Sequence, residues 1–411
     1  FEPQVFYVAT EKNGIFKCIN SNKKLGAISK LSYTEGVDTR SLNMLFKDRE
    51  DNLWFLKKNG LVLMSQSRWK LFQDKNGLHA DTILSVLIDS KNNCWVGSNI
   101  GLQVYSVTSI YENMPASLTL KETVFDKEVT CIYEDIYGNI WFGTYGFGLY
   151  KYNPKTKKLK SVPLKTEFEN DNVSCITVDD HNKIWVATLG GGISVIDHIN
   201  ENEIVKNFGA DDGLLVNYIY AVLCDSENLR WVGTDGLGLV EYTAGIFIKV
   251  NEKSFIDAKS VYSIVKSHSG NVWFNMSENG LFRFDGKTII NYNTSNGLTD
   301  NNPLSITSFK NQVIAIHTTG IDVFNEKSKQ FSYYNFNDIE VEPNLNASFT
   351  DKKGNVWIGT NKGLILFRSG ELLSDTIAPI VSISSMLVQN EEYNMQANNT
   401  FSSGHNNFAF N

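Results

Sequence analysis

The sequence lacks the usual marks of an enzyme, a metalloprotein or a membrane span. Its 411 residues include six histidines without metal-ligand spacing and five cysteines that form no CxxC pair. No HExxH, GxSxG or P-loop motif is present. The sequence also contains no run of 18 apolar residues, the length that a membrane-spanning helix needs. We therefore predict no catalytic residue, no metal site and no cofactor, and contact with a membrane only through regions outside this sequence.

Positive charge is also scarce. Lysine and arginine number 38 against 45 aspartates and glutamates, and the formal net charge is −7. Proteins that bind nucleic acid carry a basic surface, so no nucleic-acid partner is expected. The odd number of cysteines says little about the redox compartment. Cys131, Cys175 and Cys224 lie in apolar runs and are interpreted as single buried thiols.

Sustained helical periodicity is missing too, and a repeat takes its place. The stretch DIYGNIWFGTYGFGLYKY, residues 135–152, recurs along the chain with its tryptophan aligned. The aligned positions, at steps of 41 to 47 residues, are Tyr7, Trp54, Trp95, Trp141, Trp185, Trp231, Trp273, Ile314 and Trp357. Seven of the eight tryptophans occupy this anchor position, and only Trp69 lies elsewhere. Such a period indicates a repeat architecture.

Each repeat reads as four short strands. A run such as VTCIYE (129–134) is followed by an acidic turn, the anchor strand, a glycine turn and a third strand, and most copies add a weaker fourth strand. The runs are rich in Val, Ile, Tyr, Phe and Trp and are bounded by Gly, Asn and Asp, as β-strands are. Four strands repeated at about 40–45 residues are typical of propeller blades. We therefore predict an all-β fold, a β-propeller of four-stranded blades.

The recurring residues have structural interpretations. An aspartate six residues before the anchor can bind its own backbone in a tight turn; these residues are Asp48, Asp89, Asp135, Asp179, Asp225 and Asp351. The anchor tryptophans are expected in the core, with ligand contact as the alternative, because a large aromatic buries about 150–250 Å². The glycine-rich YGFGLY (145–150) joins strand to strand, whereas a phosphate loop must open a helix. It is therefore predicted to be a turn.

The nine copies exceed the number of blades in one propeller, because propellers usually close at four to eight blades. We predict that residues 1–66 are the last blades of a preceding propeller, residues 67–372 are a seven-bladed ring, and residues 373–411 are a linker and the first strands of a β-sandwich. The chain is thus expected to be a segment of a longer protein. The last copy lacks a fourth strand, so the segment 67–73 is expected to supply it and close the ring. The copy around Ile314 lacks both tryptophan and aspartate, and a distorted blade is expected there.

The units NGLHADTILSVLIDSKNNCWVGSNIGLQVY (76–105) and DDGLLVNYIYAVLCDSENLRWVGTDGLGLVEY (211–242) resemble the two-component-regulator propeller repeat. The tail from Ala378 is similar to the triple-tyrosine β-sandwich that follows such propellers. The resemblance implies the periplasmic sensor region of an inner-membrane hybrid two-component system of Bacteroidetes, which detects glycan-derived oligosaccharides. It places the histidine kinase and the transcription regulation outside this segment, so the segment itself is not an enzyme.

One face of the ring should carry both the loops between second and third strands and the loops that lead into each blade. Function tends to lie on loops, and a sugar needs flat apolar surfaces beside hydrogen-bonding groups. The predicted ligand-binding residues are Tyr145, Phe147, Tyr218, Asn217, Asp235, Asn99, His317 and Asn361. Leu189, Glu278, His79, Asp81, Asn301 and Asn302 occupy the same loops. For each residue the alternative is an ordinary exposed loop position. We also expect an oligosaccharide ligand and a homodimer.

Two other functions remain open. Some seven-bladed propellers with similar GNVWF units are lyases, which need a base on the binding face. His317 and His79 are available, but no convergent pair is visible in the sequence. A scaffold that binds another protein through the ring is the second alternative. The sequence names neither the ligand nor the propeller that binds it.

Overall fold

Short apolar runs between turn residues form strands throughout the chain, as their β-branched and aromatic content favours. The computed structural model describes residues 4–10, 14–21, 24–30, 42–47, 53–57, 60–64, 69–111, 114–164, 172–199, 202–226, 229–250, 259–336, 339–368, 386–388, 391–393 and 408–410. Among these, the helical segments are two single 3-10 turns, η2 (Asp74–Asn76) and η3 (Ala210–Asp212). The chain divides into two units, Arg68–Gly370 and Phe1–Ser67 with Glu371–Asn411.

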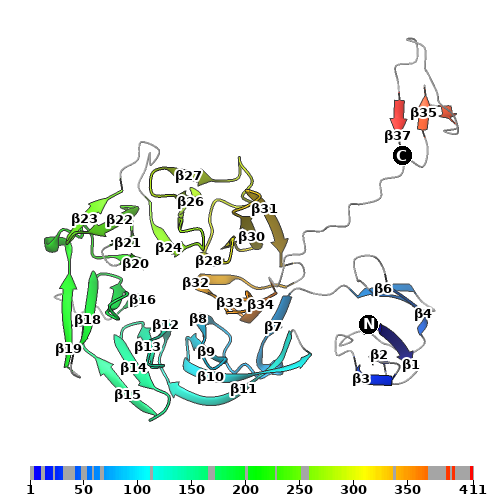
Figure 1. Ribbon diagram of the computed structural model, residues 1–411, viewed down its shortest axis with the longest axis horizontal. Coiled ribbons are helices and arrows are strands. Elements are labelled where there is room, and N and C mark those ends of the chain that lie inside the picture. Colours follow the sequence, from blue (N-terminus) through cyan, green and yellow to red (C-terminus); the bar gives the residue numbers. More distant parts are fainter. Residues whose placement is uncertain are drawn as a thin grey trace. The chain divides into compact units, whose positions relative to one another are not determined.

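The unit Arg68–Gly370 is a ring of seven blades, each a four-stranded antiparallel sheet (Figure 1). Blades 1 and 2 consist of β8 (Ile83–Ile88), β9 (Asn93–Ser98), β10 (Gly101–Tyr111) and β11 (Met114–Phe125), then β12 (Val129–Glu134), β13 (Ile140–Thr144), β14 (Leu149–Asn153) and β15 (Lys158–Val162). Blades 3 and 4 consist of β16 (Val173–Val178), β17 (Ile184–Thr188), β18 (Ile193–Ile199) and β19 (Asn202–Phe208), then β20 (Ile219–Ser226), β21 (Leu229–Thr234), β22 (Leu239–Thr243) and β23 (Ile246–Lys249). The predicted seven-bladed all-β fold is confirmed.

The remaining blades follow the same order. Blades 5 and 6 consist of β24 (Val261–Lys266), β25 (Val272–Met276), β26 (Gly280–Phe284) and β27 (Ile289–Tyr292), then β28 (Ser305–Phe309), β29 (Gln312–Ile316), β30 (Gly320–Asn325) and β31 (Gln330–Asn335). Blade 7 consists of β32 (Pro343–Thr350), β33 (Val356–Thr360), β34 (Gly363–Phe367) and, from the other end of the unit, β7 (Trp69–Phe72). First strands of successive blades contact one another around the centre, and β32 contacts β8 (Figure 1).

The ring closes through its seventh blade. β7 pairs antiparallel with β34, with Phe72 opposite Leu364 and Trp69 opposite Phe367. This is the position expected for the segment 67–73. The outer strand of blade 7 thus comes from the start of the unit and its other three strands from the end, which leaves no open edge between first and last blades.

The hydrophobic core lies between neighbouring blades. One cluster joins Trp141 and Leu149 of blade 2 to Val173 and Ile184 of blade 3, and equivalent clusters fill five further junctions. The six anchor tryptophans of the ring are at most 5% exposed, which confirms them as core residues. Burial of such a ring is worth up to about 4–6 kcal/mol at about 25 cal/mol per Å².

In five of the seven blades the residue two positions after the anchor is glycine or alanine. A Cβ on Gly143, in the anchor strand of blade 2, would lie 2.4 Å from Cγ1 of Val173 and 2.7 Å from Sγ of Cys131. A glycine is needed there because the first strands approach so closely. Burial raises the pKa of the Cys131 and Cys175 thiols, although each residue as a whole is only half-buried.

The repeated aspartate does more than form a turn. In blade 2, Oδ1 of Asp135 accepts the backbone N–H groups of Tyr137 (2.9 Å) and Asn139 (2.8 Å). Its Oδ2 accepts the indole N–H of Trp141 at 2.9 Å. The same indole bond recurs at Asp89, Asp179, Asp225 and Asp351. The predicted turn role is confirmed for Asp135, and the anchor's buried N–H explains why a carboxylate recurs; Asp48 lies outside the described residues.

Blade 5 lacks this aspartate and takes its carboxylate from blade 6. Ser267 stands at the position, and Oε1 of Glu326, after β30, accepts the indole N–H of Trp273 at 3.1 Å. Glu326 also accepts the Ser267 hydroxyl (2.9 Å) and the Asn271 amide (3.0 Å). Burial alone would raise the pKa of Glu326, but these hydrogen bonds outweigh it and hold the pKa below its ordinary value.

Blade 6 is regular, so the expected distortion around Ile314 is wrong. β28 and β29 pair without a register shift, and Ile314 is fully buried. Trp69, the one tryptophan outside the repeat, lies between blades 6 and 7. Its ring lies 5.0 Å from that of Phe336, after blade 6, and 4.4 Å from that of Phe367 in blade 7.

The other unit contains three three-stranded sheets. They are β1 (Gln4–Thr10), β2 (Gly14–Ser21) and β3 (Lys24–Lys30); β4 (Leu42–Lys47), β5 (Leu53–Lys57) and β6 (Gly60–Met64); and β35 (Met386–Val388), β36 (Glu391–Tyr393) and β37 (Phe408–Phe410). The first two are antiparallel sheets of consecutive strands, and their assignment to a preceding propeller stays a prediction. The third sheet contains all the described residues of 373–411, and its assignment to a β-sandwich stays a prediction.

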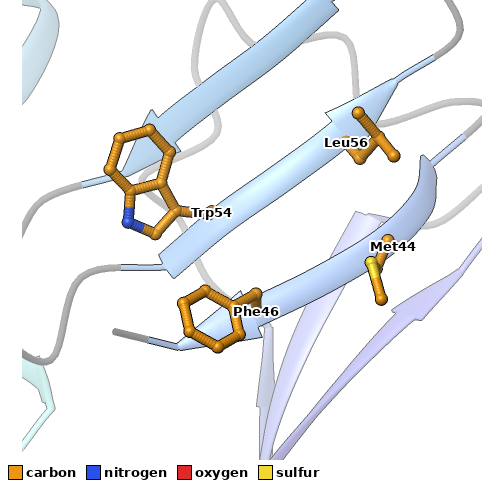
Figure 2. A pocket seen from close by; sticks show the side chains of 4 residues that line it. All are labelled: Met44, Phe46, Trp54 and Leu56. Carbon is orange, nitrogen blue, oxygen red and sulfur yellow. The ribbon is translucent and has the colours of Figure 1, made fainter. Parts of the chain in front are cut away.

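An open apolar pocket of about 270 Å³ lies on the β4–β5 sheet (Figure 2). Met44, Phe46, Trp54 and Leu56 line it side by side on the two strands. Phe46 pairs with Trp54 as Leu87 pairs with Trp95 in blade 1. Leu87 and Trp95 are buried by blade 2, whereas Phe46 is 60% exposed. This face therefore has the chemistry of an inter-blade surface.

Candidate ligand-binding face

Two sets of loops meet at one face of the ring, as the sequence led us to expect. We call it the loop face: the described residues of 73–82, 99–100, 126–128, 145–148, 163–172, 189–192, 209–218, 235–238, 250–260, 277–279, 293–304, 317–319, 336–342 and 361–362. In six blades the first residue of the loop between second and third strands donates its N–H to the carbonyl just before the first strand. In blade 2, Tyr145 donates to Glu128 at 3.2 Å, and in blade 4, Asp235 donates to Tyr218 at 3.0 Å.

Three aromatic side chains are exposed on this face. Tyr145 and Phe147, in the hairpin loop of blade 2, are 55% and 49% exposed, and Tyr218, before blade 4, is 54% exposed. Tyr218 also forms an isolated bridge with Leu189 of blade 3. The three rings offer flat apolar surfaces, and the two tyrosines add a polar hydroxyl, which suits the faces of a pyranose.

The polar candidates fall into two groups. Asn99 and Asp235 are exposed, and Asp235 is hydrogen-bonded to the hydroxyl of Ser260. Asn217 and Asn361 are half-buried, and their Oδ1 atoms accept the backbone N–H groups of Ala210 (2.9 Å) and Glu342 (3.0 Å). The exposed side chains of Asn99 and Asp235 can contact a ligand. The side-chain oxygens of Asn217 and Asn361 already accept backbone hydrogen bonds that stabilise the loops.

His317 does not lie on the surface. It occupies the place of Thr144 in the repeat and is completely buried, with Nε2 at 2.9 Å from Oδ2 of the buried Asp322. Asp322 also accepts the N–H and the hydroxyl of Thr299. His317 is therefore placed to hold blade 6 together, and it cannot touch a surface ligand in this arrangement. His79 is half-exposed before blade 1, with Nδ1 at 3.5 Å from Asp74, so the two histidines form no catalytic pair.

The inner strands contain aromatic residues that sequence reasoning missed. In blades 1 to 4 one residue of the first strand is bulged near the loop face: Leu84, Thr130, Ser174 and Tyr220. A bulge changes the direction of its side chain. The hydroxyls of Thr130 and Ser174 donate to the carbonyl of the first residue in the next blade, at 2.5 and 2.6 Å. Tyr220 instead contacts the ring of Tyr262 in blade 5, with centroids 5.0 Å apart. Burial, then the nearby Asp235 carboxylate, raises the pKa of Tyr220.

Blade 7 carries a longer insertion, which we call the strap (residues 343–347). Between the pairs Pro343–Thr360 and Ser348–Ile358, β32 has three more residues than β33. The Asn344 amide donates to the carbonyl of Ile83 in blade 1 at 2.7 Å. The Asn346 amide donates to that of Tyr262 in blade 5, also at 2.7 Å. The strap thus ties blade 7 to non-adjacent blade 5 and leaves Leu345 40% exposed.

The described residues contain one group of side chains with a metal-like arrangement, Asp179, Asp180 and His181. The guanidinium of Arg230 lies 3.0 Å from Asp179 and 3.7 Å from Asp180. Arg230 is 4% exposed and stacks over the Trp185 ring at 5.3 Å. Asp179 and Asp180 are thus engaged in an ion pair between blades 3 and 4.

Comparison with known proteins agrees with the repeat. Residues 123–146 match the family described as two component regulator propeller, which confirms the predicted resemblance for this unit. No curated protein matches the chain. The described residues include no helix that is long and apolar enough to span a bilayer.

Three solved structures illustrate the fold. The extracellular domain of the hybrid two component system BT3049 from B. thetaiotaomicron has a TM-score of 0.74 and 22% identity, over 98% of this chain and 55% of that one. That of BT4673 from the same organism has a TM-score of 0.63 and 18% identity, over 94% and 56%. A streptogramin B lyase has a TM-score of 0.59 and 16% identity, over 73% and 97%. The chain spans about half the length of the two sensor structures, and at these identities the likeness establishes the fold.

Proposed function

We propose that this chain is the ligand-sensing region of a hybrid two-component sensor kinase, on the periplasmic side of the inner membrane. Its ligand is a glycan-derived oligosaccharide. The propeller match at residues 123–146 and the likeness to the extracellular domains of BT3049 and BT4673 support the sensor role. The kinase and the transcriptional output lie outside these 411 residues.

The observation that carries the ligand class is the set of exposed rings on the loop face, Tyr145, Phe147 and Tyr218. Most other aromatic side chains of the ring pack between blades, where they serve the fold. Exposed rings beside the accepting groups of Asn99 and Asp235 can bind the apolar face and the hydroxyls of a sugar together.

The experiment is a thermal-shift screen of the chain with oligosaccharides, followed by calorimetry on any hit. Tyr145→Ala and Tyr218→Ala should each weaken binding about tenfold or more without unfolding the ring. Tyr137→Ala is the matched control, because Tyr137 is 63% exposed on the opposite side of the same blade. Unchanged affinity in both loop-face variants would remove these residues from the site. Binding of a protein instead of any sugar would favour a scaffold.

The proposed signal is a shift between two arrangements of a homodimer. A ligand can move such an equilibrium only through different affinities for the two states. We therefore expect saturating ligand to change small-angle scattering from the full sensor region. Scattering that stays the same at saturation would contradict this mechanism while leaving ligand binding intact.

A further inference from the structure

The two faces of the ring carry opposite charge. We call the side opposite the loop face the turn face: the described residues of 89–92, 135–139, 154–157, 179–183, 244–245, 267–271, 285–288, 310–311, 326–329, 351–355 and 368. The loop face has eleven acidic residues against four basic ones. The acidic residues are Asp74, Asp81, Asp126, Glu128, Asp211, Asp212, Asp235, Glu278, Asp300, Glu340 and Glu342, and the basic ones are Lys75, Lys127, Lys259 and Lys362.

The turn face has the reverse balance, with eight acidic and eleven basic residues when Asp225, the equivalent turn aspartate near the end of β20, is counted with it. The acidic residues are Asp89, Asp135, Asp179, Asp180, Asp225, Asp285, Glu326 and Asp351, and the basic ones are Lys91, Lys155, Lys157, Lys183, Lys287, Lys310, Lys327, Lys329, Lys352, Lys353 and Arg368. Six of its carboxylates accept indole N–H groups and point inward. The charge that the turn face presents to solvent is therefore mainly positive.

Acidic residues neighbour Tyr145 and Tyr218 through the backbone of the loop face. Glu128 is hydrogen-bonded through its carbonyl to Tyr145, and Asp126 precedes it by two residues. Tyr218 shares its loop with Asp211 and is bonded through its carbonyl to Asp235. Two cations are also close by: Lys127 lies between Asp126 and Glu128 and is exposed, and Lys259 pairs with Glu278. Acidic residues still outnumber basic ones around these rings, and such a mainly negative field selects by charge.

We infer that the ligand of the loop face is an oligosaccharide without carboxylate, sulfate or phosphate groups. This inference rests on the proposed function and specifies the chemical class of the ligand. Ionised carboxylates are acceptors only, so they bind the hydroxyl donors of a neutral sugar and repel an anionic one. An amino sugar, which adds a cationic donor, satisfies the same condition.

The test uses matched sugars with the full 411-residue chain at low ionic strength. Galacto-oligosaccharides are compared with oligogalacturonides, and xylo-oligosaccharides with glucuronate-substituted ones, first on an array and then by calorimetry. The uncharged member of a pair that binds should bind at least about tenfold more tightly, and added salt should narrow the gap. Equal or tighter binding of the acidic member overturns the inference and leaves the proposed function standing. If no sugar binds, the proposed function fails.

A charge variant sharpens the result. Asp126→Asn with Asp211→Asn removes two exposed carboxylates that are not among the predicted contact residues. It should raise affinity for the acidic sugar about threefold or more and change affinity for the neutral one less than twofold. Thr156→Lys with Ser328→Lys shifts the net charge equally but on the turn face, where both residues are exposed. The same gain in this control would trace the effect to net charge, not to the loop face, and overturn the inference.

Discussion

The two faces of the ring differ in what the repeat preserves. On the turn face the same contact recurs: a carboxylate closes a turn and accepts the buried indole N–H, as at Asp135 and Trp141. On the loop face the blades differ, with exposed rings at Tyr145 and Phe147 in blade 2, and the strap of blade 7 follows directly after its entry loop. A buried group must be satisfied in every blade, whereas an exposed loop residue is free to vary. The repeated residues thus report on folding, and the divergent ones are where recognition can be placed.

The largest difference between the faces should come from one blade. Trp141→Ala removes a fully buried ring and should lower the free energy of unfolding by about 3–5 kcal/mol. Tyr145→Ala, four residues later on the loop face, should change it by about 0.5 kcal/mol or less. Urea unfolding of both variants measures the contrast, and similar losses would mean that the two faces do not divide stability and binding in this way.

The carboxylates should differ in the same direction. Asp135→Ala leaves the buried indole N–H and two backbone donors without their acceptor, at a cost of about 2–3 kcal/mol. Asp235→Ala removes an exposed carboxylate and should cost about 0.5 kcal/mol or less. Thermal unfolding compares the pair directly. An equal fall in Tm would contradict the assigned roles.

The borrowed carboxylate of blade 5 gives a sharper test. Glu326→Ala should destabilise by about 2 kcal/mol, because Trp273, Asn271 and Ser267 all donate to it. Adding Ser267→Asp restores the carboxylate at the usual place six residues before the anchor and should recover about half of the loss. A double variant no more stable than Glu326→Ala would show that the exchange between blades is not equivalent.

The turn face should also respond to acid. Burial opposes ionisation of Asp179, but hydrogen bonds from Trp185, Lys183 and Arg230 hold its pKa below the ordinary value. The stability from this group is complete above the unfolded pKa of about 3.9 and is lost as pH falls through the lowered folded pKa. Asp179→Asn should therefore be less stable than the parent at pH 7 and lose less between pH 5 and pH 3. Urea midpoints at the three pH values decide it, and parallel curves would contradict it.

The smallest effect belongs to the strap. Asn344→Ala loses one bond to Ile83 and should cost about 1 kcal/mol, while Leu345→Ala, on the same segment, should cost about 0.5 kcal/mol or less. A larger loss for Leu345 would show that the strap is held by packing. Thermal unfolding of the two variants is sufficient.

The sequence predicted the features that recur in the repeats, and it did not predict the contacts between blades. The anchor tryptophans, the turn aspartates and the strand pattern follow from local periodicity, and so does the position of the two loop sets. Glu326 serves Trp273 from 53 residues away, so no spacing rule within a repeat could reveal it. Trp69 fills the junction beside the copy that lacks an anchor, which depends on ring closure. His317 looked like a loop residue because the repeat has a threonine there, but its side chain turns inward to Asp322.

The candidate site was only partly predictable for the same reason. Tyr145, Phe147 and Tyr218 were found from their loops. Tyr220 and Tyr262 lie within strands, and a one-residue bulge, which leaves no clear mark in the sequence, brings Tyr220 toward its neighbour. An aromatic residue where other copies have Thr130 or Ser174 was the available signal.

The pairing of Trp69 with Phe367 has a mechanical consequence. Both connections of the ring to the rest of the chain leave from the same end of one four-residue ladder, β7 with β34. Tension between them acts as on the open end of a zipper and breaks the ladder bonds one after another, instead of shearing them all at once. Under force, β7 would therefore separate from β34 first, while the other six blades carried almost no load.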